Sequence, residues 1–167
     1  SAVRVAEVWY IIPSILVTAL FPAIINAKIT STELYYKRLK KLGLFLIGLA
    51  VAISLPITLL ASFIMNTLYG EAFARGTIVL QIYVWATVGI FLGSLVLNYL
   101  IAENYRKMLF FTSFMPMLIN VILNILWIPT FGIAGAAYAT FVSYMFVPLS
   151  VLFFKKTRSE FYQICKS

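Results

Sequence analysis

Residues 124–144 read NILWIPTFGIAGAAYATFVSY, and they lie inside a run from Met108 to Phe154 that contains no charged residue. A single straight helix over that run would be roughly 70 Å long at about 1.5 Å per residue, more than twice the ~30 Å thickness of the hydrocarbon core of a bilayer. The run therefore does not fit one membrane span. Pro129 and Gly132 stand near its middle and predict a tight, outward-facing turn between the two helices of a hairpin.

The composition favours a membrane protein over a large soluble domain. Hydrophobic residues make up 63% of the 167 residues and charged residues 11%, and the mean hydropathy is +1.00. At about 20 apolar residues per span, the chain holds five spans. Helices are expected at about 5–27, 42–65, 76–102, 108–128 and 133–154, followed by a cytoplasmic tail at 155–167. We predict an all-α, polytopic membrane helix bundle. We also expect a piece of a longer protein, because the chain opens on Ser1 in mid-pattern.

The basic residues indicate which loops face the cytoplasm. The formal net charge is +8, and eleven of the thirteen Lys and Arg residues lie between the first two predicted spans, between the third and fourth, or after the fifth. Loops rich in Lys and Arg are retained on the cytoplasmic side, so the pattern predicts five alternating spans and a cytoplasmic C-terminus. A nucleic-acid partner is not expected, because it would need a continuous basic face with interleaved aromatic residues.

The chain lacks the side chains that most catalytic and metal sites use. It has no histidine, no paired cysteine and no cluster of carboxylates, so a metal site or a nucleophile with its base lacks components. The single cysteine, Cys165, lies in the predicted cytoplasmic tail, where thiols stay reduced. We expect neither an enzyme nor a bound cofactor or metal.

Small residues mark surfaces where helices are expected to approach each other closely. One stripe with i, i+3, i+4 spacing follows the predicted turn, and a small-xxx-small pair lies in the third span. The residues predicted to pack in this way are Gly89, Gly93, Gly132, Gly135, Ala136, Ala139, Thr140 and Ser143.

The stretch from Thr30 to Lys41, between the first two spans, has two interpretations of similar weight. Thr30 and Glu33 have capping-box spacing, and the basic residues behind them favour a short interfacial helix that meets anionic lipid. A solvated, charged loop is the alternative.

Several motifs occur in an order that resembles a family of transporters. SAVRVAEVWYIIP is followed by ALFPAI, then by LYGEAF, then by NVILNILWIPTFGIAGAAYAT. Together they resemble the C-terminal half of polysaccharide flippases of the O-antigen type, within the multidrug/oligosaccharidyl-lipid/polysaccharide superfamily. The most specific parts are the Arg-x-x-Glu at Arg4 and Glu7 and the succession from Asn120 to Ala137. The resemblance covers essentially the whole chain and implies that its five helices form most of the C-terminal lobe of a twelve-helix transporter.

The resemblance also implies a function. Flippases of this family move undecaprenyl-diphosphate-linked oligosaccharide across the bacterial inner membrane by alternating access, for the assembly of O-antigen, capsule or exopolysaccharide. The implied partners are the lipid-linked oligosaccharide, membrane lipid, the N-terminal half of the same protein and a polysaccharide polymerase, and the candidate coupling ions are a proton and sodium. Two alternatives stay open: a drug or small-molecule antiporter of the same superfamily, and a non-transporting membrane assembly subunit. Acidic residues inside the spans would favour the antiporter, and the uncharged stretches hold none.

Arg4 and Glu7 are the first candidate substrate-binding residues. They are three residues apart and share a face of a helix near the outer end of the first span. The resemblance implies a cavity-lining pair, in which Arg4 binds the diphosphate and Glu7 is its counter-ion or a proton-coupled group. An equally weighted alternative is a pair of ordinary interfacial charges in water.

Asn120 and Asn124 are the second candidate pair, one turn apart on the fourth span. They are candidates for lining the cavity and bonding sugar hydroxyls, although hydrogen bonding between helices is the preferred interpretation. Gln81, Tyr83 and Asn98 on the third span are weaker candidates of the same kind. A solvated cytoplasmic turn is expected at Glu103, Arg106 and Lys107, with its basic residues as alternative contacts for an incoming diphosphate.

Overall fold

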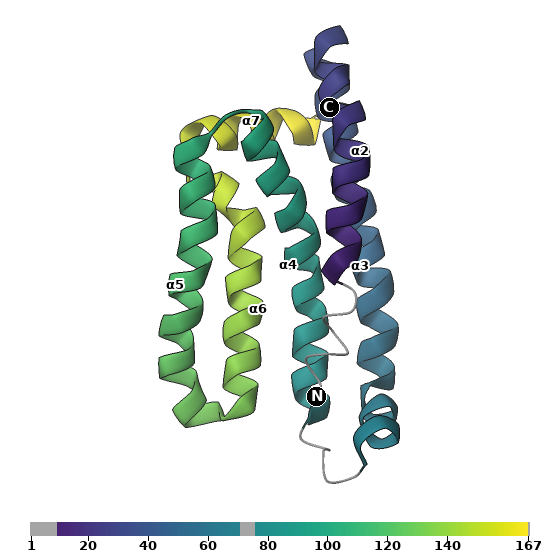
Figure 1. Cartoon of the computed structure of the whole chain (residues 1–167), viewed down its shortest axis with the longest axis vertical. Helices are drawn as coiled ribbons and strands as arrows, with labels where there is room; N and C mark the ends of the chain where they lie inside the picture. Colours follow the sequence, from purple (N-terminus) through teal and green to yellow (C-terminus); the bar gives the residue numbers. More distant parts are fainter. Residues whose placement is uncertain (1–9, 71–75, 167) are drawn as a thin grey trace.

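The computed structural model describes residues 10–70 and 76–166, and nearly all of them are helical (Figure 1). The elements are α2 (Ile11–Thr30), α3 (Thr32–Tyr69), α4 (Gly76–Ala102), α5 (Arg106–Phe131), α6 (Ile133–Leu149), the 3-10 helix η3 (Ser150–Leu152) and α7 (Lys155–Lys166). These two ranges contain no strand. The all-α prediction is confirmed for the described part of the chain.

Five of the described elements are long and apolar enough to cross a bilayer, namely α2, α3, α4, α5 and the continuous stretch of α6 and η3. The longest is α3 with 38 residues, which at about 1.5 Å per residue extends well beyond a ~30 Å hydrocarbon core. Large apolar side chains such as Leu59, Phe63 and Ile125 are exposed on the outside of the bundle. A surface of this kind suits lipid and not water, and the chain is a multi-pass membrane protein.

The central helix is α4. It packs against α3 on one side and α6 on the other, and α5 packs against α6 as the second arm of a hairpin (Figure 1). The shorter α2 lies against α3 and α4. The last helix, α7, crosses one end of the bundle, where Lys40 Nζ donates to the Cys165 carbonyl oxygen at 2.8 Å. This bond ties the end of α7 to α3.

The start of α3 corrects both interpretations of the stretch from Thr30 to Lys41. This stretch is neither a separate helix nor a loop, because the residues from Thr32 onward form the first turns of α3. The N-cap is Ser31 and not Thr30: its backbone is extended, with φ of −163°, and its hydroxyl accepts from the Leu34 N–H at 3.4 Å. No Gly or Pro stands between Thr32 and Leu42, so nothing stops the helix before the apolar run.

The predicted hairpin is present, but its turn is shorter than expected. The helix α5 continues through Pro129 to Phe131, and Gly132 alone separates it from α6, with φ of +59°. The prediction that Pro129 ends the helix is wrong, because a proline in the last turn removes a single backbone hydrogen bond. In the same turn the Thr130 hydroxyl donates to the Leu126 carbonyl at 3.0 Å.

Some of the other predicted helix ends are accurate and some are not. The bounds of α4 are those predicted, whereas α6 ends at Leu149 and not at Phe154. Pro148 precedes this end, and η3 then redirects the chain toward α7. The predicted tail contains α7, whose Thr157 is buried while Lys155 and Arg158 are exposed.

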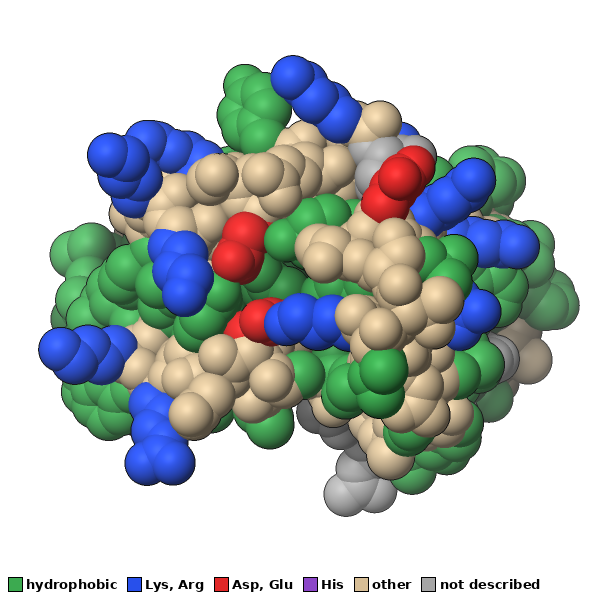
Figure 2. Space-filling view, turned by 90° about the horizontal axis from the view of Figure 1, so that it is seen from above, with side chains coloured by type: hydrophobic (Ala, Val, Ile, Leu, Met, Phe, Trp, Pro, Cys, Tyr) green, Lys and Arg blue, Asp and Glu red, His purple; other side chains and the backbone are tan. Residues whose placement is uncertain are grey.

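Every charged residue of the described ranges lies toward the same end of the bundle, which we call the charged end. They occupy the last turn of α2, the first turns of α3, the connection from α4 to α5, the first turn of α5, and α7. Figure 2 views this end from above, with Lys and Arg side chains spread over the face and Glu side chains between them. The opposite end carries the Gly132 turn. We call it the uncharged end, because none of its described residues is charged.

Candidate functional site

The first candidate pair, Arg4 and Glu7, lies outside the described residues, so its role stays a prediction. The second pair, Asn120 and Asn124, is described in full. The Asn124 side-chain amide donates at 2.9 Å to both the backbone oxygen and Oδ1 of Asn120. The Asn120 amide in turn points at Thr140 Oγ1 on α6, at 3.5 Å. The pair therefore forms a chain of polar groups that leads from α5 to α6.

This chain of polar groups continues onto α4 and the start of α2. Thr140 Oγ1 lies 2.9 Å from the Ala136 carbonyl and 3.2 Å from the Tyr83 hydroxyl. A hydroxyl has one proton, so when Thr140 donates to Ala136, Tyr83 donates to Thr140. The Tyr10 hydroxyl, just before α2, donates to the Tyr83 carbonyl at 3.3 Å.

We call these five residues the polar track: Tyr10, Tyr83, Asn120, Asn124 and Thr140. Three of them lie at the same depth, because Tyr83, Thr140 and Asn124 are each seven residues from the uncharged end of their helix. At 1.5 Å per residue this is roughly 10 Å inside the bundle. All five residues are half-buried, so each of them reaches the surface of the bundle in part.

Polar groups that face outward at membrane depth require a covering. Hydrocarbon offers them no hydrogen bond. A polar group left without a hydrogen bond there costs about 4 kcal/mol of free energy. The polar track therefore suits a surface that another part of a protein covers, or one that borders a water-filled cavity. It does not suit a surface that faces lipid.

Two of the weaker candidates do not belong to the polar track. The Gln81 amide donates to the Thr58 carbonyl of α3 at 3.2 Å, on another side of α4. The Asn98 amide donates to Ser94 of its own helix at 2.9 Å. Of the three candidates on α4, Tyr83 alone is joined to the asparagine pair by the described hydrogen bonds.

The predicted packing residues lie mostly between helices. A Cβ atom added at Gly89 would stand 2.7 Å from the Tyr144 backbone, and one at Gly93 would stand 2.9 Å from Val147 Cγ1, both on α6. A Cβ at Gly135 would overlap the Trp127 carbonyl of α5. Gly135, Ala139 and Ser143 are buried, Ala136 and Thr140 are half-buried, and Gly132 is exposed at the turn. Most of the stripe therefore lets α6 fit closely between α4 and α5.

A second polar cluster, at the charged end, corrects the prediction of a solvated turn. Both carboxylate oxygens of Glu103 lie 2.7 Å from Lys28 Nζ, and one of them accepts from the Tyr35 hydroxyl at 3.0 Å. The Glu103 side chain is only 13% exposed. It joins α2, α3 and the end of α4, while Arg106 and Lys107 are exposed as expected.

Glu160 is a further functional candidate that the sequence reasoning missed. Its carboxylate on α7 accepts from the hydroxyls of Tyr99 and Tyr105, the latter at 2.7 Å. Lys156 Nζ lies 4.5 Å from the centre of the Tyr105 ring. Burial, together with the bond to Glu160, raises the pKa of Tyr105 above its ordinary value. Tyr105 therefore stays protonated and holds α7 against the bundle.

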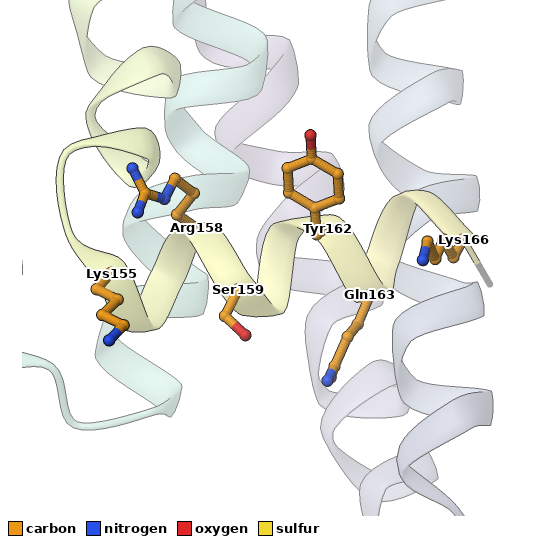
Figure 3. A pocket seen from close by; sticks show the side chains of 6 residues that line it. All are labelled: Lys155, Arg158, Ser159, Tyr162, Gln163 and Lys166. Carbon is orange, nitrogen blue, oxygen red and sulfur yellow. The ribbon is translucent and has the colours of Figure 1, made fainter.

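The outer face of α7 carries a shallow hollow of about 380 Å³ (Figure 3). It is lined by Lys155, Arg158, Ser159, Tyr162, Gln163 and Lys166, which recur at helical spacing along one face. Such a basic face is well solvated and needs no ligand. No group of three or more His, Cys, Asp or Glu side chains that could hold a metal ion is found in residues 10–70 and 76–166.

Comparison of the chain with protein families, with curated proteins and with solved structures gives no match.

Proposed function

We propose that the chain is part of a flippase that moves undecaprenyl-diphosphate-linked oligosaccharide across the bacterial inner membrane. The observation that carries this proposal is the polar track, a line of half-buried polar side chains across three membrane-length helices and the start of a fourth. The resemblance of the sequence to O-antigen flippases supports it. We infer that this face lines a cavity against an N-terminal lobe of the same protein.

The chemistry of the substrate favours such a face. Sugars and a diphosphate lose much hydration energy in hydrocarbon, whereas a polyprenyl chain prefers to stay there. A cavity with polar walls that opens sideways to lipid meets both needs, and alternating access follows from rocking one lobe against the other. In this arrangement the groups that the described bonds leave over are available to sugar hydroxyl groups: the second amide proton of Asn120, Oδ1 of Asn124 and the Tyr83 hydroxyl oxygen as an acceptor.

The charged end belongs in the cytoplasm under this proposal, since Lys and Arg concentrate on that side of membrane proteins. The C-terminus is then cytoplasmic as well. The partners are the lipid-linked oligosaccharide, membrane lipid and a polysaccharide polymerase, and transport is coupled to a proton or to sodium.

Export by asparagine variants tests the proposal in a host whose own copy is deleted. Asn124→Leu removes a polar group from the polar track, so surface polysaccharide should fall while the membrane level of the protein stays the same. Asn98→Leu is the matched control, because Asn98 bonds only within its own helix by the described contacts. Full display by Asn124→Leu at normal expression would contradict the cavity role.

Variants of Arg4, the residue expected to bind the diphosphate, provide a second test. Arg4→Lys keeps the charge but loses the planar fork, and Arg4→Ala loses both. Export should therefore fall in the order wild type, Lys, Ala. Glu7→Gln should matter less in the Arg4→Ala background than in the wild type if Glu7 only neutralises Arg4.

A further inference from the structure

An apolar groove lies on the side of the bundle, near the charged end. Its floor is α4, its walls are α3 and α6 on either side of α4, and α7 crosses above it (Figure 1). The groove has a volume of about 390 Å³, and its lining includes Gly43 and Leu44 of α3, Leu95 of α4, Leu149 of α6 and Phe161 of α7. We call it the lateral groove.

The lateral groove faces away from the polar track. On α4, Tyr83 and the groove residue Leu92 are nine residues apart, which is two and a half turns at about 3.6 residues per turn. Thr140 and Leu149 have the same offset on α6. The two features therefore occupy opposite sides of these two helices, so the groove is separate from the surface that we propose for transport.

The apolar lining of the lateral groove and its exposure to the bilayer favour a hydrocarbon chain as its occupant. Its walls belong to membrane-length helices, and Leu44 and Leu149 are 61% and 53% exposed, so the groove opens sideways toward lipid. An apolar hollow gives water too few hydrogen-bond partners. A flexible hydrocarbon chain is the occupant that the bilayer supplies at this depth.

A basic group stands where the lateral groove meets α7. Lys40 lines the groove, and its ammonium group has three protons, of which one is donated to the Cys165 carbonyl. The other two remain for an anion at the level of the lipid headgroups. A phosphate with a net negative charge complements this site, whereas a zwitterionic headgroup also brings its own cation close to Lys40.

We propose that the lateral groove binds one anionic phospholipid, with an acyl chain along α4 and its phosphate at Lys40. The lipid lies under α7, whose position is fixed at Glu160 by Tyr99 and Tyr105 and at Cys165 by Lys40. It thereby fills the space between α3 and α6 and supports α7 from below. This role is independent of the transported substrate.

Glycine variants of α3 provide a matched test. A Cβ added at Gly43 would lie 3.5 Å from Leu95 Cδ2, inside the groove, whereas one at Gly48 would meet nothing within 4 Å. The protein is reconstituted in nanodiscs of phosphatidylglycerol and phosphatidylcholine, and native mass spectrometry then counts the retained phospholipids. Wild type and Gly48→Leu should retain one phosphatidylglycerol, and Gly43→Leu should lose it.

Further variants keep the test decisive. Lys40→Gln should lower the preference for phosphatidylglycerol roughly fivefold, and Lys107→Gln, at the same end but outside the groove, should not. Leu149→Trp fills the groove from the exposed wall and replaces Gly43→Leu should that variant fail to fold. Equal retention by the groove variants and their controls would overturn the proposal. Displacement of phosphatidylglycerol by added undecaprenyl phosphate would overturn it too, because the groove would then belong to the transported lipid.

Discussion

The two sides of α4 and α6 differ although they belong to the same apolar helices. One side carries Tyr83 and Thr140 of the polar track, toward the uncharged end, and the other carries Leu92 and Leu149 of the lateral groove, toward the charged end. The two sides differ in the position of their residues around the helix axis and along it, and not in the overall composition of the helices. A helix with high mean hydropathy can therefore carry polar groups on one side and apolar groups that face lipid on the other.

The largest expected effect comes from a change that disturbs both sides at once. Gly89 lies where the α4 and α6 backbones touch, so a Cβ there would collide with the Tyr144 backbone. Gly89→Val should force these helices apart and lower the free energy of unfolding by about 3 kcal/mol. Thermal unfolding in detergent measures the loss. Gly48→Val, which meets open space, should stay near wild type, and equal stability of both variants would show that α4 and α6 do not depend on this contact.

The next largest loss of stability is expected from a change that weakens only the attachment of α7, above the lateral groove. In Glu160→Gln the amide offers one acceptor oxygen where the carboxylate offers two, so Tyr99 or Tyr105 loses its partner. The cost should be about 1.5 kcal/mol, seen as faster proteolysis within α7. If the proposed function holds, polysaccharide export by this variant should change much less than export by Asn124→Leu. An unchanged rate of cleavage in α7 would contradict the anchoring role of Glu160.

A smaller effect is expected at alkaline pH. Because the pKa of Tyr105 is raised in the folded protein, its contribution to stability is fully present below the ordinary tyrosine pKa of about 10 and is lost as the pH rises through the folded value. The attachment of α7 should therefore be constant through neutral pH and weaken only above about pH 10. The tyrosinate difference spectrum between wild type and Tyr105→Phe measures this titration. A Tyr105 signal that appears at the ordinary pKa would show that the ring is not held as described.

The smallest effect should sharpen the description of the polar track. Thr140→Val keeps the shape of the side chain but removes the hydroxyl that joins Tyr83 to Asn120. Hydrogen bonds between membrane helices average about 0.6 kcal/mol, so stability should fall by about that amount, as measured by unfolding in detergent. Thr130→Val is the control, because Thr130 bonds to its own helix on an exposed turn. A loss of several kcal/mol would mean that the polar track is mainly structural.

The uncharged runs of the sequence predict the membrane helices well and the ends of these helices less well. The bounds of α4 follow from the sequence because the charged residues Arg75 and Glu103 flank a long apolar stretch. The hydropathy pattern does not predict the start of α3, because the helix begins in polar residues and continues into the bilayer, and hydropathy marks only the second part. Pro129 does not end α5 because it stands in the final turn, where its missing N–H has little effect.

The candidate sites were predictable to different degrees. Asn120 and Asn124 are one turn apart, so local spacing was enough to pair them. The Glu160 cluster was not predictable from spacing, since Tyr99 and Tyr105 are more than fifty residues away along the chain. The position of α7 across the bundle brings them together, and this depends on the end of α6 at Leu149.

The one-sided placement of charge in the described residues also bears on membrane voltage. Moving one elementary charge across a potential of about 100 mV changes the energy by about 2.3 kcal/mol. All charged side chains of residues 10–70 and 76–166 lie toward the charged end, so the rocking motion that we propose would carry none of them through the hydrocarbon. The gating charge of this part of the protein should therefore be close to zero, and a voltage step should leave its conformational equilibrium unchanged.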